Sequence, residues 1–152
     1  LGHIFRRVGD THASQDIAAE TFIRAMNRIG TYKDRGLSFR NWLLRIATNE
    51  VNRHLERERR RRGRERATAR RAESENEHAV RETAEHVSRA LKSLSVEHQA
   101  VLALHYFEGL GVDEIARVLG ARAGTVKSRL SRARAEMGRV LEEGATGTEG
   151  VR

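Results

Sequence analysis

The sequence predicts an all-α protein made of two small helical domains joined by a charged linker. Proline is absent and aromatic residues make up only 5% of the 152 residues, so strands are hard to place, whereas residues that favour helices are abundant. Apolar residues at helical spacing form two blocks, and between them, from about residue 62 to 76, no apolar side chain is larger than alanine. We therefore expect domains at residues 1–62 and 79–142, a flexible linker at 63–78 and a disordered tail at 143–152.

The first domain is expected to hold three helices. The first is under way at Leu1 and closes near Gly9, and the start without a Met or a cap indicates that N-terminal sequence is missing. Ser14 is placed to cap the second helix, which ends at Gly30, and Ser38 to cap a long third helix. The apolar stripes expected to face the core are Ile17, Ala18, Phe22, Ala25, Met26 and Ile29 in the second helix, and Phe39, Trp42, Leu43, Ile46 and Ala47 in the third.

The second domain contains the pattern of a helix-turn-helix. Periodicity resumes with Val80, Val87, Ala90, Leu91 and Leu94, and Ser95 then caps a helix whose inward residues are Val101, Leu102, Leu104 and Tyr106. A short helix over residues 112–119 follows, and Gly120 supplies the left-handed residue that a tight corner requires. Thr125 is expected to cap a long last helix with Val126, Leu130, Ala133, Met137, Val140 and Leu141 on one buried stripe.

The outer face of this last helix suits DNA. It carries Lys127, Ser128, Ser131, Arg132 and Arg134, which all donate hydrogen bonds and none of which is bulky and apolar. An α-helix fits the major groove, where Arg and Lys donate to guanine and Ser bonds to several base edges. A charged helix face alone is more often a solvated surface, but the short helix, glycine corner and basic second helix together favour DNA recognition.

Charge supports a polyanionic partner. The formal net charge is +8, and residues 53–71 hold ten arginines against three glutamates, a net charge of +7. A second basic cluster runs from residue 122 to 139. The first half of the 57–71 run continues the helix before it, so we expect that half to contact DNA.

Several kinds of site are excluded or disfavoured. Cysteine is absent, which excludes disulfides and thiolate zinc sites, and the seven histidines are scattered, so no metal site and no cofactor is expected. Neither a membrane-spanning segment nor a signal peptide is present, which favours a cytoplasmic protein. No clustered carboxylates or phosphate-binding loop support an enzyme acting on nucleic acid, and no catalytic residue is expected.

Two stretches resemble a known family. Residues 114–120 and 124–134 (GTVKSRLSRAR) resemble region 4 of bacterial sigma-70 family factors of the extracytoplasmic-function (ECF) group. Residues 16–25 and 39–49 resemble the helices of region 2 in the same group. The two motifs occur in the family's order, and the resemblance covers about residues 1–141.

The resemblance implies a dissociable subunit that brings core RNA polymerase to promoter DNA, binding the clamp and flap of the polymerase and regulated by an anti-sigma factor. Region 4 would recognise the minus-35 element, and region 2 would open the minus-10 element. The implied minus-35 residues are Thr125, Lys127, Ser128, Arg129, Ser131, Arg132 and Arg134, with Arg129 and Arg134 at phosphates or in packing. The implied minus-10 residues are Lys33, Asp34, Arg35, Gly36, Ser38, Asn49 and Arg53, and the clamp contacts are Asp16, Glu20 and Arg24.

One alternative stays open at the level of the sequence. A transcriptional regulator could carry a similar helix-turn-helix, with the N-terminal half serving as a helical dimerisation or sensing module. Trp42 has two interpretations as well, as a wedge that unstacks a base step or as a core residue on one helical face with Phe39 and Ile46. Core packing is the favoured one.

Overall fold

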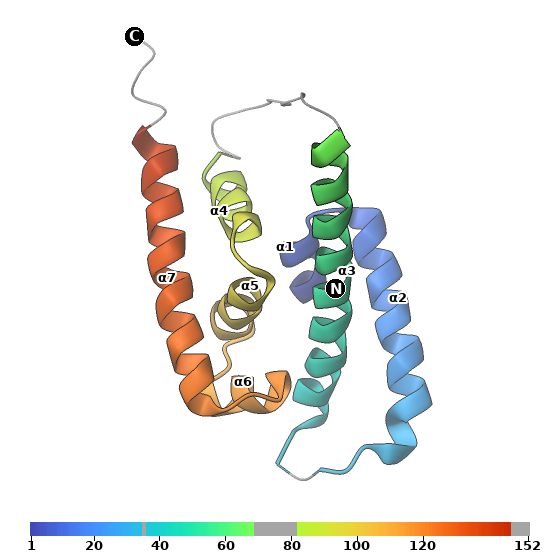
Figure 1. The fold of residues 1–152 in the computed structure, drawn as a ribbon. Helices are drawn as coiled ribbons and strands as arrows, with labels where there is room; N and C mark the ends of the chain where they lie inside the picture. Colours follow the sequence, from blue (N-terminus) through green and yellow to red (C-terminus); the bar gives the residue numbers. More distant parts are fainter. Residues whose placement is uncertain (35, 69–81, 147–152) are drawn as a thin grey trace.

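The computed structural model describes residues 1–34, 36–68 and 82–146, and within these ranges every regular element is helical. Figure 1 shows α7 and α3 as two long, roughly parallel helices with α4 and α5 between them, and α6 crossing below. The all-α prediction is confirmed. The elements are α1 (Gly2–Val8), α2 (Thr11–Arg28), η1 (Ile29–Thr31), α3 (Phe39–Thr68), α4 (Glu82–Ser93), α5 (Val96–Leu102), η2 (Ala103–Phe107), α6 (Val112–Leu119) and α7 (Ala123–Thr146).

Side-chain oxygens cap three of the helix starts within the described residues. The Ser95 hydroxyl accepts from the backbone N–H of His98, and the Ser38 hydroxyl accepts from that of Asn41 at 3.3 Å, as predicted. The prediction for α2 was wrong by four residues, because Asp10 is the cap and accepts from Ala13 N–H at 2.7 Å. Ser14 lies inside the helix and is buried, with its hydroxyl bonded back to the Asp10 carbonyl.

Two helices run further than the sequence indicated. α3 continues through residues 63–68, which we assigned to the linker, and α7 continues to Thr146, within the predicted tail. The rest of the predicted linker, including Val80, and residues 147–152 of the tail lie outside the described residues.

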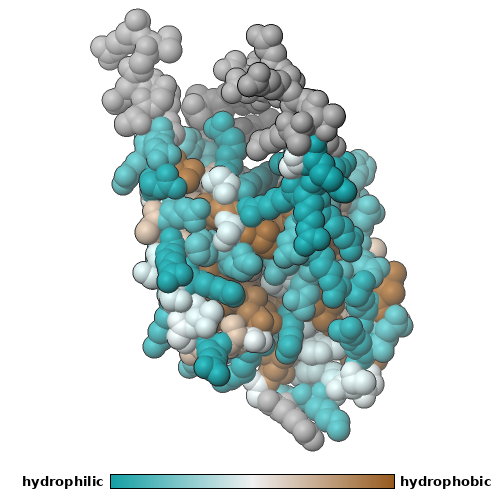
Figure 2. Space-filling view, viewed as in Figure 1, coloured by the Kyte–Doolittle hydropathy of each residue, from teal (hydrophilic) through white to brown (hydrophobic). Residues whose placement is uncertain are grey.

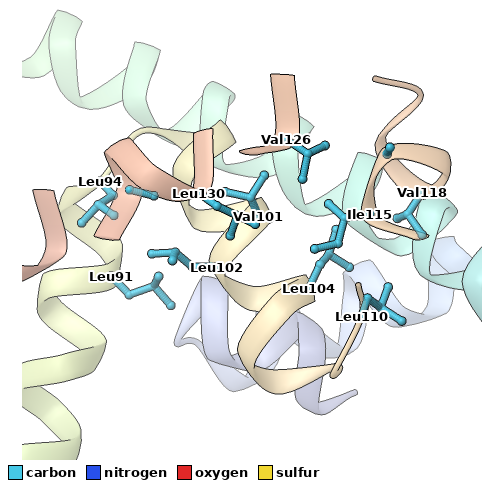
Figure 3. Close-up of a cluster of buried hydrophobic side chains, with 12 residues drawn as sticks. Leu91, Leu94, Val101, Leu102, Leu104, Leu110, Ile115, Val118, Val126 and Leu130 are labelled. Atoms are coloured by element: carbon cyan, nitrogen blue, oxygen red, sulfur yellow. The ribbon is translucent and has the colours of Figure 1, made fainter. Parts of the chain in front are cut away.

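The larger core belongs to the C-terminal half. Twelve buried side chains form it, shown in Figure 3, with Leu104, Ile115 and Val126 fully enclosed. The cluster joins α4, α5, η2, α6 and the first half of α7, and it fixes the angle between the two helices of the helix-turn-helix. Leu37 and Leu44 from the N-terminal half also pack against it.

The smaller core lies between α1, α2 and α3 around Ile4, Ile17, Ala47 and Val51. The buried face of α2 is Ser14, Ile17, Thr21 and Ala25. This corrects the predicted stripe, because Phe22, Met26 and Ile29 are 60%, 74% and 52% exposed. Thr21 takes the place expected of an apolar residue, since its hydroxyl donates to the Ile17 carbonyl and leaves no unpaired polar group.

A π-helical turn at η2 explains a second error. Tyr106 was expected to face the core, but it is 59% exposed, while Leu104 is fully buried. The wider π turn rotates the residues after it relative to an α-helix, so Tyr106 and Phe107 point outward. Arg134 and Arg6 lie over their rings, with the guanidinium carbon 5.7 Å from the centre of Tyr106 and 4.8 Å from that of Phe107.

The two halves pack against one another through polar contacts as well. Arg117 Nη1 of α6 donates to the Gly36 carbonyl at 2.8 Å, and Asn41 of α3 donates to Glu114 at 3.3 Å. Arg40 of α3 pairs with Glu108 at 2.7 Å. α6 therefore sits directly on the loop before α3 and on its first turn.

Helix α1 lies between the halves and carries two buried polar side chains. His3 Nε2 is 3.1 Å from Thr48 Oγ1, and its Nδ1 is 3.5 Å from Glu108. Burial lowers the pKa of His3, so the neutral imidazole is favoured. Arg7 is fully buried and donates to Asn52 of α3 at 2.7 Å and to the Val96 carbonyl at 3.1 Å, and burial lowers its pKa.

Candidate nucleic-acid and polymerase interfaces

The helix-turn-helix has the predicted corner. Gly120 adopts φ 64°, and its backbone N–H bonds to the Ala116 carbonyl, which ends α6 and redirects the chain. At the other end of α6 the Glu114 carboxylate accepts from Gly111 N–H at 3.0 Å, and this bond lowers the pKa of Glu114. α6 is thus fixed at both termini, and α7 leaves the corner at a defined angle.

α7 presents its polar face to solvent. Lys127, Ser128, Ser131 and Arg132, which we call the recognition face, are all exposed, while Val126, Leu130 and Ala133 on the opposite side are buried. The helix begins at Ala123, so Thr125 lies in the first turn and does not cap it, contrary to the prediction. Thr125 is exposed, and its carbonyl accepts from the Ser128 hydroxyl at 3.0 Å.

Two further arginines of α7 lie beside this face. Arg129 is half-buried, while Arg134 donates from Nε to the Tyr106 hydroxyl at 2.9 Å and lies over its ring. For Arg134 the structure shows a packing contact with Tyr106, and phosphate contacts of either arginine stay a prediction. Tyr106, which the sequence placed in the core, is the residue that orients Arg134.

The loop between η1 and α3 holds the next predicted group. Lys33, Asp34 and Ser38 are exposed, and Gly36 adopts φ 79°. Arg35 lies outside the described residues. The loop is fixed on one side by the bond from Arg117 to the Gly36 carbonyl and by Leu37, which packs on the larger core.

Aromatic side chains surround this loop. Tyr32, Phe39 and Trp42 form a cluster with ring centres 5.2 to 5.6 Å apart, and the Tyr32 hydroxyl donates to the Leu37 carbonyl at 3.1 Å. Trp42 is half-buried and Phe39 is 48% exposed. The prediction that Phe39 faces the core was therefore wrong, and Trp42 packs chiefly on other aromatic rings.

Further along α3, exposed arginines lie on one side of the helix. Asn49 is exposed, and Arg53 pairs with Glu50 at 2.7 Å. Arg53, Arg57, Arg60 and Arg64 are exposed at spacings of four, three and four residues, which places them on one side of the helix. We call this set the arginine stripe.

The outer side of α2 has two distinct faces. Asp16 is exposed, and Glu20 pairs with Arg24 at 2.6 Å, while Arg24 also contacts Glu50 of α3 at 3.1 Å. On the next face Phe22, Ile23, Met26 and Ile29 are between 52% and 74% exposed, and we call them the apolar patch. Figure 2 shows a mainly hydrophilic surface with hydrophobic side chains exposed at its right edge, where α2 lies.

Exposed apolar patches of this kind are typical of protein interfaces. Phe22, Met26 and Ile29 were expected in the core, so the patch was not predicted from the sequence. The available signal was that α2 has more apolar positions than one buried face can hold.

Within the described ranges, no group of three or more His, Asp or Glu side chains is arranged to hold a metal ion. In the same ranges, none of the helices combines the length and hydropathy needed to cross a bilayer.

Known family models match the two helical halves separately. Residues 1–61 match the family model described as sigma-70 region 2, and residues 84–137 match sigma-70 region 4. The sigma-H factor of Pseudomonas aeruginosa is 34% identical over 155 residues, a match that covers 93% of this chain and 80% of that protein. The chain belongs to the ECF group of sigma-70 family factors. Sigma factors are non-catalytic subunits of RNA polymerase.

Other ECF sigma factors match along most of this sigma factor. BldN of Streptomyces coelicolor is 34% identical over 148 residues, and SigW of Bacillus subtilis is 30% identical over 155 residues. The chain spans 56% of the length of BldN and 81% of that of SigW.

Solved structures are similar over both halves together. CnrH in complex with the cytosolic domain of CnrY has a TM-score of 0.68 and 26% identity, covering 93% of this chain and 79% of CnrH. RpoE of Bartonella quintana in complex with the anti-sigma factor NepR has a TM-score of 0.66 and 24% identity, covering 93% of this chain and 88% of RpoE, and shows the fold alone.

Proposed function

We propose that this sigma factor binds core RNA polymerase and directs initiation at specific promoters, with region 4 recognising the minus-35 element and region 2 opening the minus-10 element. The observation that carries the proposal is the presence in one chain of a region 2 unit and of a region 4 unit whose recognition face is exposed. Its place of action is the cytoplasm, where the polymerase and the chromosome are found.

The minus-35 element is assigned to the recognition face. Its side chains come from two consecutive turns of α7, which matches the reach of a recognition helix in the major groove. Lys127 and Arg132 donate to guanine acceptors, and Ser128 and Ser131 to nearby base edges. Thr125, Arg129 and Arg134 contact phosphates on either side, which sets the register of the helix.

Replacing Arg132 by Ala is expected to weaken promoter binding by about 1 to 3 kcal/mol and to relax the preference at one base pair, because one bidentate contact to a guanine is lost. Competition binding of the polymerase complex to a set of single-base-pair promoter variants measures both effects. Arg139→Ala is the control, because Arg139 is an exposed arginine of the same helix that pairs with Glu143. Equal weakening on all promoter variants would move Arg132 from base to phosphate.

The minus-10 element is assigned to the loop before α3 and to the helix that follows. Lys33, Asp34, Arg35, Gly36 and Ser38 would surround a base that has left the stack, while Asn49 and Arg53 lie at the edge of the duplex upstream. A flipped base presents its pairing edge for hydrogen bonds and its face for stacking. The neighbouring cluster of Tyr32, Phe39 and Trp42 offers the stacking surface.

The arginine stripe extends this contact to the duplex between the two elements. Four arginines spread over 12 residues of helix span roughly 16 Å, which is about five phosphate steps along one strand. The stripe begins at Arg53, so it continues the line of the minus-10 contacts upstream. Its contacts are with phosphates, and they carry no sequence preference.

Changing Arg57 and Arg60 together to Gln is expected to reduce the slope of log binding constant against log salt concentration by about 1 to 2, because each lost phosphate contact removes about 0.9. Titration of the full chain with a duplex of random sequence at several salt concentrations gives the slope. Arg62→Gln, which removes one charge from the opposite side of the same helix, is the control and is expected to leave the slope unchanged. An unchanged slope in the double variant would mean that the stripe is only solvated.

Core polymerase is assigned to two surfaces. The outer side of α2 binds the clamp, with the apolar patch at its centre and Asp16 and Glu20 at the rim. Arg24 holds α2 to α3 through Glu50 and supports this surface from the side. Region 4 contacts the flap and is thereby held over the minus-35 element.

An anti-sigma protein is the proposed regulator. The two solved structures with similar arrangements hold RpoE together with the anti-sigma factor NepR and CnrH together with the cytosolic domain of CnrY. A protein that covers the apolar patch would compete directly with the clamp.

The two halves have to separate on the promoter. The minus-35 and minus-10 elements lie about 25 base pairs apart, which is roughly 85 Å of duplex. In the structure α6 touches both the loop before α3 and α3 itself, so we infer that one molecule in this arrangement does not reach both elements. We propose that the described structure is the closed form of the free protein.

Transcription in vitro tests the assignment. Purified core polymerase with this chain is expected to start transcripts at promoters that core alone does not use, and sequencing of the enriched promoters would reveal both elements. A helix-turn-helix regulator with an N-terminal sensing module is the alternative. Failure to bind core, with any preceding native sequence restored, would favour that alternative.

A further inference from the structure

A basic cavity lies where the two halves meet, away from the surfaces assigned above. Its volume is about 370 Å³, and its walls come from α1, α2, α3, α4 and α5. Five cationic side chains line it against two carboxylates, a formal net charge of +3 without His54. The cations are Arg7, Arg59, Arg61, Arg62 and Lys92, and the carboxylates are Asp10 and Glu58.

The two carboxylates are already engaged. Asp10 accepts from Ala13 N–H as the cap of α2, and Glu58 accepts from Arg61 at 3.1 Å. Among the described residues, Arg62 and Lys92 form no ion pair. The positive charge of the cavity is therefore only partly balanced by its own walls.

Arg7 raises the free-energy cost of the excess positive charge in the cavity. It is fully buried, and only Nη2 has partners, while Nε and Nη1 have none within the described residues. A buried guanidinium without a counter-charge is strongly unfavourable, and an unsatisfied buried donor calls for an unseen ligand or ion. Like charges on Arg59, Arg62 and Lys92 around the same space add to the cost.

We propose that this cavity binds a phosphate-bearing small anion, such as pyrophosphate or the phosphates of a nucleotide. Arginine forks and a lysine ammonium are the groups that bind phosphate oxygens best, and the volume lies in the range of small-molecule sites. Arg62 and Lys92 close on the anion from the two halves, and Arg59 and Arg7 supply positive charge beneath it.

Because the cavity lies between the two halves, a bound ligand affects whether the halves stay together. Helix α3 of the N-terminal half contributes Arg62, and region 4 contributes Lys92, so the site is complete only when the halves are together. An anion that binds the closed form alone shifts the protein toward it. This site does not depend on the proposed function, and its test uses the isolated chain.

The test compares pyrophosphate with sodium chloride at equal ionic strength. Calorimetric titration of the full chain is expected to show one saturable site, and saturating pyrophosphate to raise Tm by roughly 5 °C. In Arg62→Gln/Lys92→Gln the dissociation constant is expected to rise at least about tenfold. Both side chains are exposed, and their removal relieves repulsion, so Tm without ligand should not fall. Arg60→Gln/Arg64→Gln, the same charge change on the other side of α3, should stay within about twofold of the natural chain.

A distance measurement provides a second readout. The chain has no cysteine, so Glu56→Cys and Ala135→Cys place spin labels on exposed positions of α3 and α7 alone. Pyrophosphate is expected to narrow the distribution of label distances to a single short population, and the Arg62→Gln/Lys92→Gln background to abolish that response.

Three results would overturn the proposal. One is equal binding by the cavity variant and the natural chain, and another is no saturable binding at all. The third is binding only after Glu73, Glu75 and Glu77 are changed to Gln, which would mean that these carboxylates of the chain itself compete for the cavity.

Discussion

Met26→Glu in the apolar patch is expected to weaken binding to core polymerase at least about 100-fold, equivalent to about 2.7 kcal/mol. Met26 is 74% exposed, so the change leaves the core of region 2 intact. The loss arises because the new carboxylate has to be desolvated against an apolar partner surface at the centre of the interface. Fluorescence anisotropy of the labelled chain titrated with core polymerase measures the affinity.

Asn27→Glu tests whether the polar face of α2, rather than the apolar patch, binds core polymerase. Asn27 is the next residue, is exposed and receives the same charge, but it lies about 100° further round the helix, toward the side of Asp16 and Glu20. We expect at most a few-fold loss there. A large loss in Asn27→Glu with little effect of Met26→Glu would return the clamp contact to the polar face that the sequence resemblance implied.

Leu104→Ala is expected to lower the free energy of unfolding by about 2 to 5 kcal/mol, because it removes a fully buried side chain from the larger core and leaves a cavity. Leu104 packs in the same cluster as Ile115 of α6 and Val126 of α7. In the variant, the angle between these two helices of the helix-turn-helix is therefore expected to be less well fixed. Urea unfolding followed by circular dichroism gives the stability, and minus-35 binding is expected to fall with it.

Leu1→Ala deletes the same atoms at a position that is 71% exposed, and the change in stability there should stay within about 0.5 kcal/mol. A loss below about 1 kcal/mol in Leu104→Ala would contradict the close packing of this core, since a filled site cannot lose a leucine at so small a cost.

The helix-turn-helix was predictable because its determinants are local. Three of these determinants act within a few residues of the chain: the left-handed conformation of Gly120, the cap at Ser95 and the apolar periodicity of residues 112–119. All three were confirmed. The recognition face followed from the same periodicity, because the stripe of Val126, Leu130 and Ala133 fixes which side of α7 is outside.

Burial in α2 was not predictable in the same way. Apolar residues cover two faces of that helix, and periodicity alone cannot say which one meets α1 and α3. The helix buries Ser14 and Thr21, whose hydroxyls bond to carbonyls four residues back, and it exposes Phe22 and Met26. A polar residue that satisfies itself within its own helix is equivalent to a small apolar one in the core, and sequence patterns do not reveal this.

The contacts between the halves also lie beyond sequence reasoning. Arg7 and Val96 are 89 positions apart, and Gly36 and Arg117 are 81 apart. Each of these hydrogen bonds joins a single pair of polar groups. No repeating pattern in the sequence therefore predicts them. The basic cavity belongs to the same class, because its cations come from segments that the sequence analysis treated separately.

The contact of α6 with the loop before α3 also sets a thermodynamic constraint. If polymerase and promoter engage the halves only when they are apart, the observed dissociation constant equals the intrinsic one divided by the open fraction. A substitution at this contact, such as Arg117→Ala, therefore has opposite signs in two measurements, lowering the stability of the free chain while tightening its complex. The strength of one intramolecular contact thereby governs how much polymerase is needed before transcription begins.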